Sequence, residues 1–183
     1  MRLRFLLTAL TLAVLMTGCT VRSLNPLYTD KDVVFEPALL GTWAEQGDAS
    51  SNWTIQKSGE NGYRLVSSEG MKTLEGRLVK LSGRLFLDVT PKDGDDSFEI
   101  PAHLFVKVEL SGDTLRTAML DADWVDKTAD LKALGLSYIR IGDKVVLTGP
   151  TNQLQSFVVR FAGDETVFSH LEDYHRTAFD LGK

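Results

Sequence analysis

Apolar and polar residues alternate with a period of two along most of the chain, in short segments separated by compact turns. The turns place glycine next to asparagine, aspartate or serine, and they occupy residues 58–62, 68–70, 82–83, 111–113 and 142–143. Glycine, asparagine and aspartate readily adopt the positive φ that tight hairpins require. The pattern therefore predicts consecutive antiparallel strands, that is, a β-meander.

The alternation also assigns a face to each residue of the predicted strands. The apolar face holds Trp53, Ile55, Tyr63, Leu65, Leu74, Leu78, Leu85, Leu87, Val89, Leu104, Val106, Val108, Leu115, Thr117, Met119, Ile139, Ile141, Val145 and Leu147. Polar residues lie between them, and we expect Asp88, His103 and Lys107 to point into water. Each strand is thus apolar on one side only, as in an antiparallel sheet with one solvated face.

A sheet of about eight or nine such strands must cover its apolar face and protect its edges. Too few helical residues are predicted to form a covering layer. Closure of the sheet on itself meets both needs. The sequence therefore predicts a mainly β fold, an up-and-down meander that closes into a barrel.

Segments with helical spacing interrupt or follow the meander. The first covers residues 123–134 with Asp123 as its N-cap, and the second covers 152–162 after a Thr151 cap. Their apolar stripes comprise Trp124, Leu131 and Leu134 in the first and Leu154, Phe157, Val158 and Phe161 in the second. The tail 164–175 is predicted as another short helix. We expect one inserted helix, and a C-terminal helical segment that docks on the barrel wall or closes one end.

The N-terminus has the layout of a secretory signal. Arg2 and Arg4 form a basic region, and an uncharged apolar run extends from Phe5 to Met16. This run is too short to span a bilayer as a helix. We therefore expect residues 1–18 to be a signal peptide.

Cys19 follows Leu15-Met16-Thr17-Gly18 at the end of this run. The arrangement resembles the lipobox of bacterial lipoproteins, although Met16 stands where leucine is commonest. The resemblance implies that a diacylglycerol is attached to Cys19, that the signal is removed after Gly18, and that the new amino terminus is acylated. Such acyl chains hold a protein on a membrane without a transmembrane helix. Thr20 is not the aspartate that commonly retains lipoproteins in the inner membrane, which implies an outer-membrane location facing the periplasm in a two-membrane cell.

Removal of 18 residues from 183 leaves 165, enough for one domain with a sizeable core. The net charge of −5 becomes −7 without Arg2 and Arg4, and this mildly acidic balance argues against nucleic acid as a partner. With its single cysteine lipidated, the mature chain has no disulfide. We expect residues 19–32 to be a lipidated tether and 33–183 to form the barrel domain.

Gly41 and Trp43 open the predicted meander. This Gly-x-Trp in the first strand resembles the motif of lipocalins and related calycin barrels, which implies a lipocalin-like barrel and an arginine that stacks on the tryptophan. Arg140 and Arg160 are the candidates for that arginine. The stretch from Leu24-Asn25-Pro26-Leu27-Tyr28 through the Gly-x-Trp also resembles a group of uncharacterised bacterial lipoproteins, for which no activity is implied.

The candidate ligand-binding residues are apolar side chains on the inward face of the barrel, namely Trp53, Tyr63, Leu87, Val106 and Met119. We expect Gly41 and Trp43 to be structural, with Trp43 packed at the closed end. Trp124 is interpreted as an anchor between helix and barrel. Whether side chains fill the barrel or leave a cavity stays open at this point, because barrels of this size do either.

No catalytic constellation is recognisable. The chain lacks a Gly-x-Ser-x-Gly nucleophile elbow and a glycine-rich phosphate loop. His170 and His175 are spaced wrongly for a metal pair on a helix, and residues 91–96 lack the downstream glycine and glutamate of an EF-hand. We expect no enzyme activity, no metal and no cofactor beyond the covalent lipid. Three hypotheses remain: a membrane-anchored binding module for a small apolar ligand or lipid, a structural lipoprotein that contacts other proteins of the cell envelope, and, least favoured, an envelope enzyme whose site the sequence does not reveal.

Overall fold

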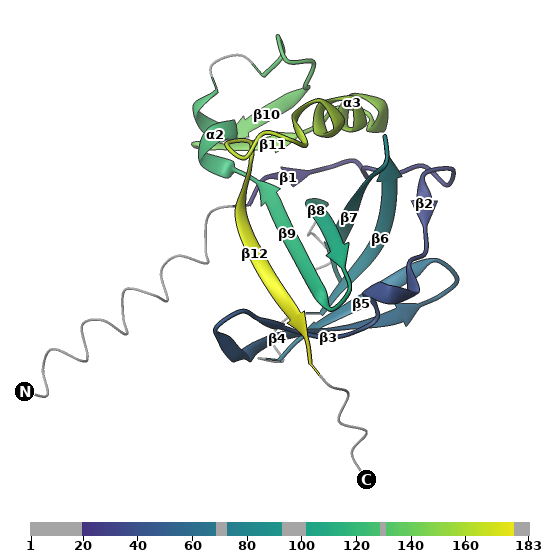
Figure 1. Ribbon diagram of the computed structural model, residues 1–183. Coiled ribbons are helices and arrows are strands. Elements are labelled where there is room, and N and C mark those ends of the chain that lie inside the picture. Colours follow the sequence, from purple (N-terminus) through teal and green to yellow (C-terminus); the bar gives the residue numbers. More distant parts are fainter. Residues whose placement is uncertain (1–19, 69–72, 93–101, 129–130, 178–183) are drawn as a thin grey trace, which may run out of the picture.

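The structure, a computed structural model, describes residues 20–68, 73–92, 102–128 and 131–177. Cys19, the predicted signal peptide and most of the polar segment 91–96 lie outside these ranges. The main feature is a closed antiparallel barrel of eight strands (Figure 1). Its strands are β3 (Gly41–Glu45), β4 (Asp48–Ser58), β5 (Gly62–Ser67), β6 (Thr73–Leu81), β7 (Arg84–Pro91), β8 (Leu104–Ser111), β9 (Thr114–Leu120) and β12 (Phe168–Arg176).

Consecutive strands from β3 to β9 pair as a meander, and β12 closes the ring between β9 and β3. A short strand β2 (Val33–Val34) pairs with β6 at Leu78 and Val79, beyond the residues of β6 that pair with β5. The 3-10 helix η1 (Pro37–Leu39) leads directly into β3. The predicted lipocalin-like fold class, a mainly β up-and-down barrel, is confirmed.

The barrel has an inner core made by the predicted apolar face of its strands. Buried members include Trp43, Ile55, Tyr63, Leu65, Leu78, Leu87, Val89, Val108, Leu115 and Tyr174. A second core lies on the outside of the wall, where Val79, Phe86, Phe105 and Ala118 pack under the remaining elements. The strands β6 to β9 are therefore apolar on both faces.

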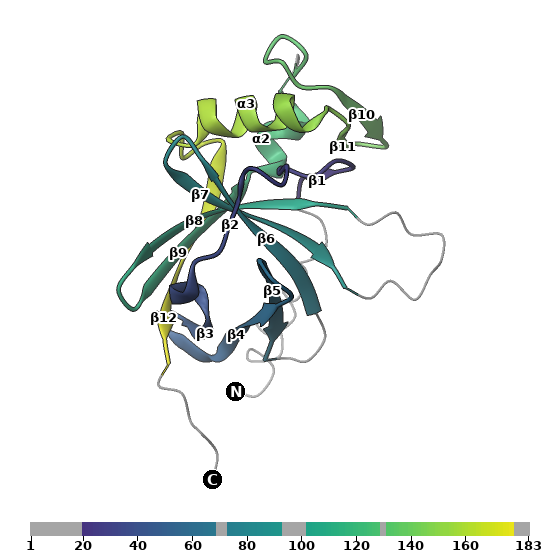
Figure 2. The ribbon, with the colours of Figure 1, turned by 90° about the vertical axis from the view of Figure 1, so that its right-hand side faces the viewer.

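A layer of two helices and a small sheet covers this outer wall, as Figure 2 shows. The helices are α2 (Ala122–Lys127) and α3 (Thr151–Phe161). The sheet has the order β1 (Arg22–Ser23), β11 (Lys144–Leu147), β10 (Tyr138–Ile141). In the described part of the chain, no helix is long and apolar enough to cross a bilayer.

Residues 138–147 were expected to contribute barrel strands, and this prediction is wrong in its placement. They form the hairpin of β10 and β11, which pairs with β1 instead of the barrel. Val145 and Leu147 are buried in the outer core, whereas Ile139 and Ile141 are exposed. Period-two alternation identifies a strand with one buried face, but it does not specify the sheet to which the strand belongs.

The tail 164–175 was expected to be helical, but it contains the closing strand. After α3 the chain turns at Asp164, whose side chain accepts a hydrogen bond from the Thr166 amide. β12 then pairs with both neighbours, with a register shift between Ser169 and Glu172. Because of that bulge, Phe168 faces the outer core and Tyr174 the inner core. The bulge interrupts the alternation that would have identified the strand.

The two helices also differ from expectation in their caps. α2 begins after Asp121 instead of Asp123, since the Asp121 carboxylate accepts from the Trp124 amide. It ends at Lys127, well before residue 134. α3 lies where it was predicted, but Thr151 does not cap it, because its hydroxyl donates to the carbonyl of Pro26.

The segment expected to be a flexible tether is packed against the domain instead. Val21 and Leu27 are buried in the outer core, and β1 pairs with β11. The Asn25 side chain donates to the carbonyls of Thr148 and Gly149. The folded part therefore includes residues 20–32, since apolar side chains on this segment complete the outer core.

Candidate functional site

The Gly-x-Trp motif lies where η1 covers one end of the barrel. Trp43 is fully buried, and its indole Nε1 donates to the carbonyl of Leu39 at 2.9 Å. The Arg176 guanidinium of β12 lies 4.2 Å from the ring centroid of Trp43. It also donates to the carbonyls of Leu40 and Ala38, each at 2.6 Å. One cation thus holds β12, β3 and η1 together.

Arg176 is the stacking arginine, so the prediction of Arg140 or Arg160 is wrong. Arg140 lies over Tyr138 in the small sheet, and Arg160 lies over Phe161 on α3. Both belong to the outer layer. Gly41 has a φ of +133°, and a Cβ there would come within 2.6 Å of the Arg176 Nη1 atom. In this motif, Gly41 leaves room for the Arg176 guanidinium because it has no side chain, and Trp43 provides the aromatic face on which the guanidinium stacks.

Tyr63, predicted as a ligand-binding residue, lies near η1 and contacts the segment that precedes it. Its hydroxyl accepts from the Glu36 amide at 2.6 Å and lies 3.2 Å from the Glu36 carbonyl, to which it donates. Its ring stacks on Phe35, with centroids 5.2 Å apart. Burial raises the pKa of its hydroxyl. With both hydrogen-bonding functions used by Glu36, Tyr63 has a structural role.

The inward-facing side chains of the barrel differ in exposure. Trp43, Tyr63 and Leu78 have no exposed surface, and Ile55, Leu65, Leu87, Val89, Val108 and Leu115 are 3–8% exposed. The partly exposed inward-facing side chains are Trp53, which is paired with Trp43, Leu85 and Leu110 beside the turns that follow β6 and β8, and Leu74, Leu104, Val106 and Met119. The last four lie toward the barrel end opposite η1, which we call the open end.

The other predicted ligand-binding residues lie on strands of the barrel wall. Leu87 is directly paired with Val106 across β7 and β8, and Val106 with Met119 across β8 and β9. Trp53 stands opposite Trp43 on the neighbouring strand. Of the five predicted ligand-binding residues, the structure therefore brings Leu87, Val106 and Met119 together on one wall of the barrel. Trp53 lies apart from them, on β4.

Inside the barrel, Gly76 marks a narrow section. A Cβ at Gly76 would lie 3.2 Å from the terminal carbons of both Leu65 and Leu87. The side chains of Leu65 and Leu87 therefore pack closely against the backbone of Gly76 inside the barrel.

A polar pair adjoins this apolar surface on β12. Glu172 is paired with the inward-facing Thr117, and the Tyr174 hydroxyl donates to the Glu172 carboxylate. Burial, and then Glu172, raise the pKa of Tyr174. The tyrosine therefore stays protonated and acts as a donor. Within the described ranges, no three His, Cys, Asp or Glu side chains lie together as a metal site would require.

On the outer wall, the buried Asp88 is paired with the half-buried His103, although both were expected to point into water. Asp88 is only 2% exposed. Its carboxylate lies 2.7 Å from the His103 Nδ1 atom and accepts from the Leu27 amide at 2.7 Å. His103 also exchanges backbone hydrogen bonds with Ser23. The pair clasps the N-terminal segment onto the barrel and lines a small pocket of about 190 Å³ with Tyr28, Arg77 and Thr90.

The contact of Asp88 and His103 with the N-terminal segment was not predicted, because all polar side chains on the outer face of the barrel were assumed to point into water. One signal was available: Val79, Phe86, Phe105 and Ala118 occupy outward positions of four neighbouring strands. Apolar residues on both faces of a strand indicate that both faces are covered. A polar residue among them then needs a partner.

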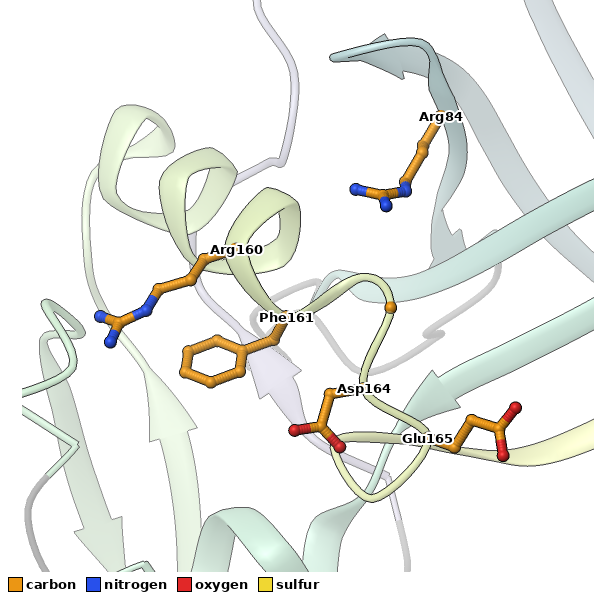
Figure 3. Close-up of a pocket in the computed structure, with 6 residues that line it drawn as sticks. Arg84, Arg160, Phe161, Asp164 and Glu165 are labelled. Atoms are coloured by element: carbon orange, nitrogen blue, oxygen red, sulfur yellow. The ribbon is translucent and has the colours of Figure 1, made fainter.

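A larger surface hollow of about 680 Å³ lies beside the end of α3. It is lined by Arg84, Arg160, Phe161, Gly163, Asp164 and Glu165 (Figure 3). The charged side chains in Figure 3 point in different directions and do not converge on a common point. Since they mix both signs of charge as well, we assign no ligand to this hollow.

Trp124, expected to anchor a helix on the barrel, lies mainly between the two helices. Its ring centroid is 6.3 Å from that of Phe157 and 5.8 Å from that of Phe161, both on α3. Its role is therefore to join α2 to α3 within the outer layer.

Comparisons of the chain with protein families, curated proteins and solved structures found no match.

Proposed function

We propose that this protein is a non-catalytic, membrane-anchored binding module whose barrel takes up the aliphatic chain of a small apolar ligand or lipid through the open end. The observation that carries the proposal is the partial exposure of the inward-facing apolar side chains of Leu104, Val106 and Met119, in contrast to the full burial of Trp43 and Tyr63. These side chains give the open end an apolar lining, which favours a ligand with an apolar part.

Affinity for such a ligand comes from removal of its methylene groups from water, at about 0.8 kcal/mol for each buried methylene. Leu65 and Leu87 pack closely against Gly76, so a chain that passes this point must displace them. Glu172 and Tyr174 are available to a polar group of the ligand that donates a hydrogen bond.

The membrane attachment belongs to the same proposal. Acylation of Cys19 places the barrel at the surface of a membrane, in the outer membrane facing the periplasm if the cell has two membranes. A lipid or apolar molecule that leaves that membrane then has a short path to the pocket.

Binding is tested with cis-parinaric acid, a fluorescent fatty acid whose linear chain matches the proposed ligand. Val106→Trp fills space at the open end and is expected to weaken probe binding by about tenfold. Val66 is the matched control because it is partly exposed and alternates with the inward-facing Leu65, which places it on the outer face of β5. Val66→Trp should leave binding unchanged. Equal probe binding in both variants, or none in the native chain, would contradict the ligand proposal.

The anchor is tested separately by the mass of the N-terminal peptide from the membrane fraction. We expect the mass of an acylated Cys19, and we expect Cys19→Ala to move the protein into the aqueous fraction. An unmodified Cys19 peptide in the native protein would overturn the anchor without bearing on the pocket.

A further inference from the structure

The small sheet has one face that packs on the protein and one that does not. Ser23 and Leu147 are paired across β1 and β11, and both are buried. Ile139 is paired with Val146, and Ile141 with Lys144. Alternation along the strands therefore directs one set of side chains away from the outer core. This set, which we call the outer sheet face, consists of Arg22, Leu24, Ile139, Ile141, Lys144 and Val146.

The outer sheet face exposes an unusual amount of aliphatic surface. Leu24 is 39% exposed, Ile139 46% and Ile141 63%. They are three of the four large hydrophobic side chains that are exposed in the described ranges, the fourth being Leu171. Single exposed apolar residues are common, but several on one face indicate a contact surface.

The chain enters the domain at this sheet. Thr20 forms a β-bridge with Asp121 at the end of β9, and β1 begins two residues later. Cys19, the predicted lipid attachment site, directly precedes Thr20. A chain of three residues extends at most about 10 Å, so acyl chains on Cys19 enter a bilayer close to the outer sheet face.

We propose that the outer sheet face lies on the lipid bilayer and orients the anchored barrel. This inference rests on the lipid anchor of the proposed function. Leu24, Ile139 and Ile141 then reach the boundary between headgroups and acyl chains, while Arg22 lies at the level of the phosphates. Lys144 is paired with Asp126 at 3.3 Å, so Arg22 carries the charge argument: a cation on this face of an acidic chain, three residues from Cys19, fits a phospholipid surface.

This orientation also places the open end of the barrel near the membrane. The backbone of Ser23, in β1, is bridged to that of His103. His103 directly precedes Leu104, one of the partly exposed side chains at the open end. Figure 2 shows the small sheet on the same side of the molecule as the ends of β7 and β8 that lead into a grey trace. A ligand would therefore travel along the membrane surface to reach the pocket.

The test uses the lipidated chain in vesicles of phosphatidylethanolamine and phosphatidylglycerol that contain acyl-chain spin labels as quenchers. A fluorophore is attached at Ile141→Cys and, as control, at Glu60→Cys. Glu60 is exposed in the turn between β4 and β5, at the η1 end. We expect strong quenching at position 141 and little at position 60. Ile139→Asp should lower the quenching at 141 by about twofold or more, whereas Asn61→Asp should not.

Equal quenching at the two positions would overturn the orientation, as would quenching at 141 that is insensitive to Ile139→Asp. Protection of position 141 without vesicles, rising with protein concentration, would assign the face to a second copy instead. Failure of the anchor is recognised independently, because the N-terminal peptide would then lack the acyl mass. All substituted residues are exposed, so the variants are expected to fold.

Discussion

Arg176 and Trp43 form the contact that fixes the closed end of the barrel. The guanidinium lies over the indole at 4.2 Å and donates to two carbonyls of the segment around η1. It also pairs with Asp113 in the turn between β8 and β9 at 3.1 Å. The first and last strands of the barrel are thereby held to each other and to η1.

Arg176→Lys is expected to destabilise the protein by about 2 kcal/mol or more. Lysine keeps the charge but loses the planar fork that reaches both carbonyls and stacks on the indole. Urea unfolding followed by tryptophan fluorescence measures the change. Arg116→Lys is the control, since Arg116 pairs with Asp173 on the surface and an exposed pair contributes about 0–1 kcal/mol. Equal losses would mean that the stack and the carbonyl bonds contribute nothing.

Gly41→Ala is expected to act through the same arginine. The new Cβ would lie 2.6 Å from the Arg176 Nη1 atom and displace the guanidinium from its carbonyls. The effects of Gly41→Ala and Arg176→Lys should therefore be clearly less than additive, by about 1 kcal/mol or more in a double-mutant cycle. Gly47→Ala is the control, because Gly47 also has a positive φ of +96° but nothing within 4 Å of its Cβ position. Additive losses would contradict the coupling.

Tyr63→Phe distinguishes a structural role of Tyr63 from a role in ligand binding. Loss of the hydroxyl leaves the amide and carbonyl of Glu36 without this partner, which is expected to destabilise the protein by about 1–2 kcal/mol. The ring and its stacking on Phe35 are retained. Probe binding to the folded variant should be unchanged. Weakened binding at full folding would restore Tyr63 to the ligand-binding residues.

The barrel interior could be predicted from the sequence because period two in a sheet directly separates inside from outside. Trp53, Leu87 and Val106 all lie on the predicted face. Sheet membership was not predictable in this way, since Ile139 and Val145 alternate as well as any barrel strand does. A local pattern carries no information on which strand a hairpin will pair with.

The arginine on Trp43 was missed for a related reason. Arg176 could be placed only by recognition of β12 as a strand and by its correct register, and the bulge between Ser169 and Glu172 conceals both. Asp88 was missed because its burial depends on a segment that is distant along the chain. The backbone amide of Leu27, 61 residues away along the chain, donates the hydrogen bond that the Asp88 carboxylate accepts. Such contacts follow from tertiary packing, which strand patterns do not encode.

Asp32 provides a pH-dependent connection between the N-terminal segment and α3. Its carboxylate accepts from the Thr29 hydroxyl at 2.7 Å and from the Gln155 amide at 2.8 Å, and these bonds lower its pKa. The charged form is thus favoured in the folded state. The stabilisation is therefore complete above the ordinary carboxyl range, near pH 4, and is lost as the pH falls through the lowered folded value.

Asp32→Asn is accordingly expected to lower the free energy of unfolding at neutral pH by about 1 kcal/mol or less, given the position near the surface. The difference from the native chain should shrink as the solution is acidified below about pH 4, because the native carboxyl is then protonated as well. Urea unfolding at several pH values measures this trend. Asp30→Asn is the control in the same exposed turn and should have a smaller effect at neutral pH. A difference that grows on acidification would show that the carboxylate destabilises the contact between this segment and α3.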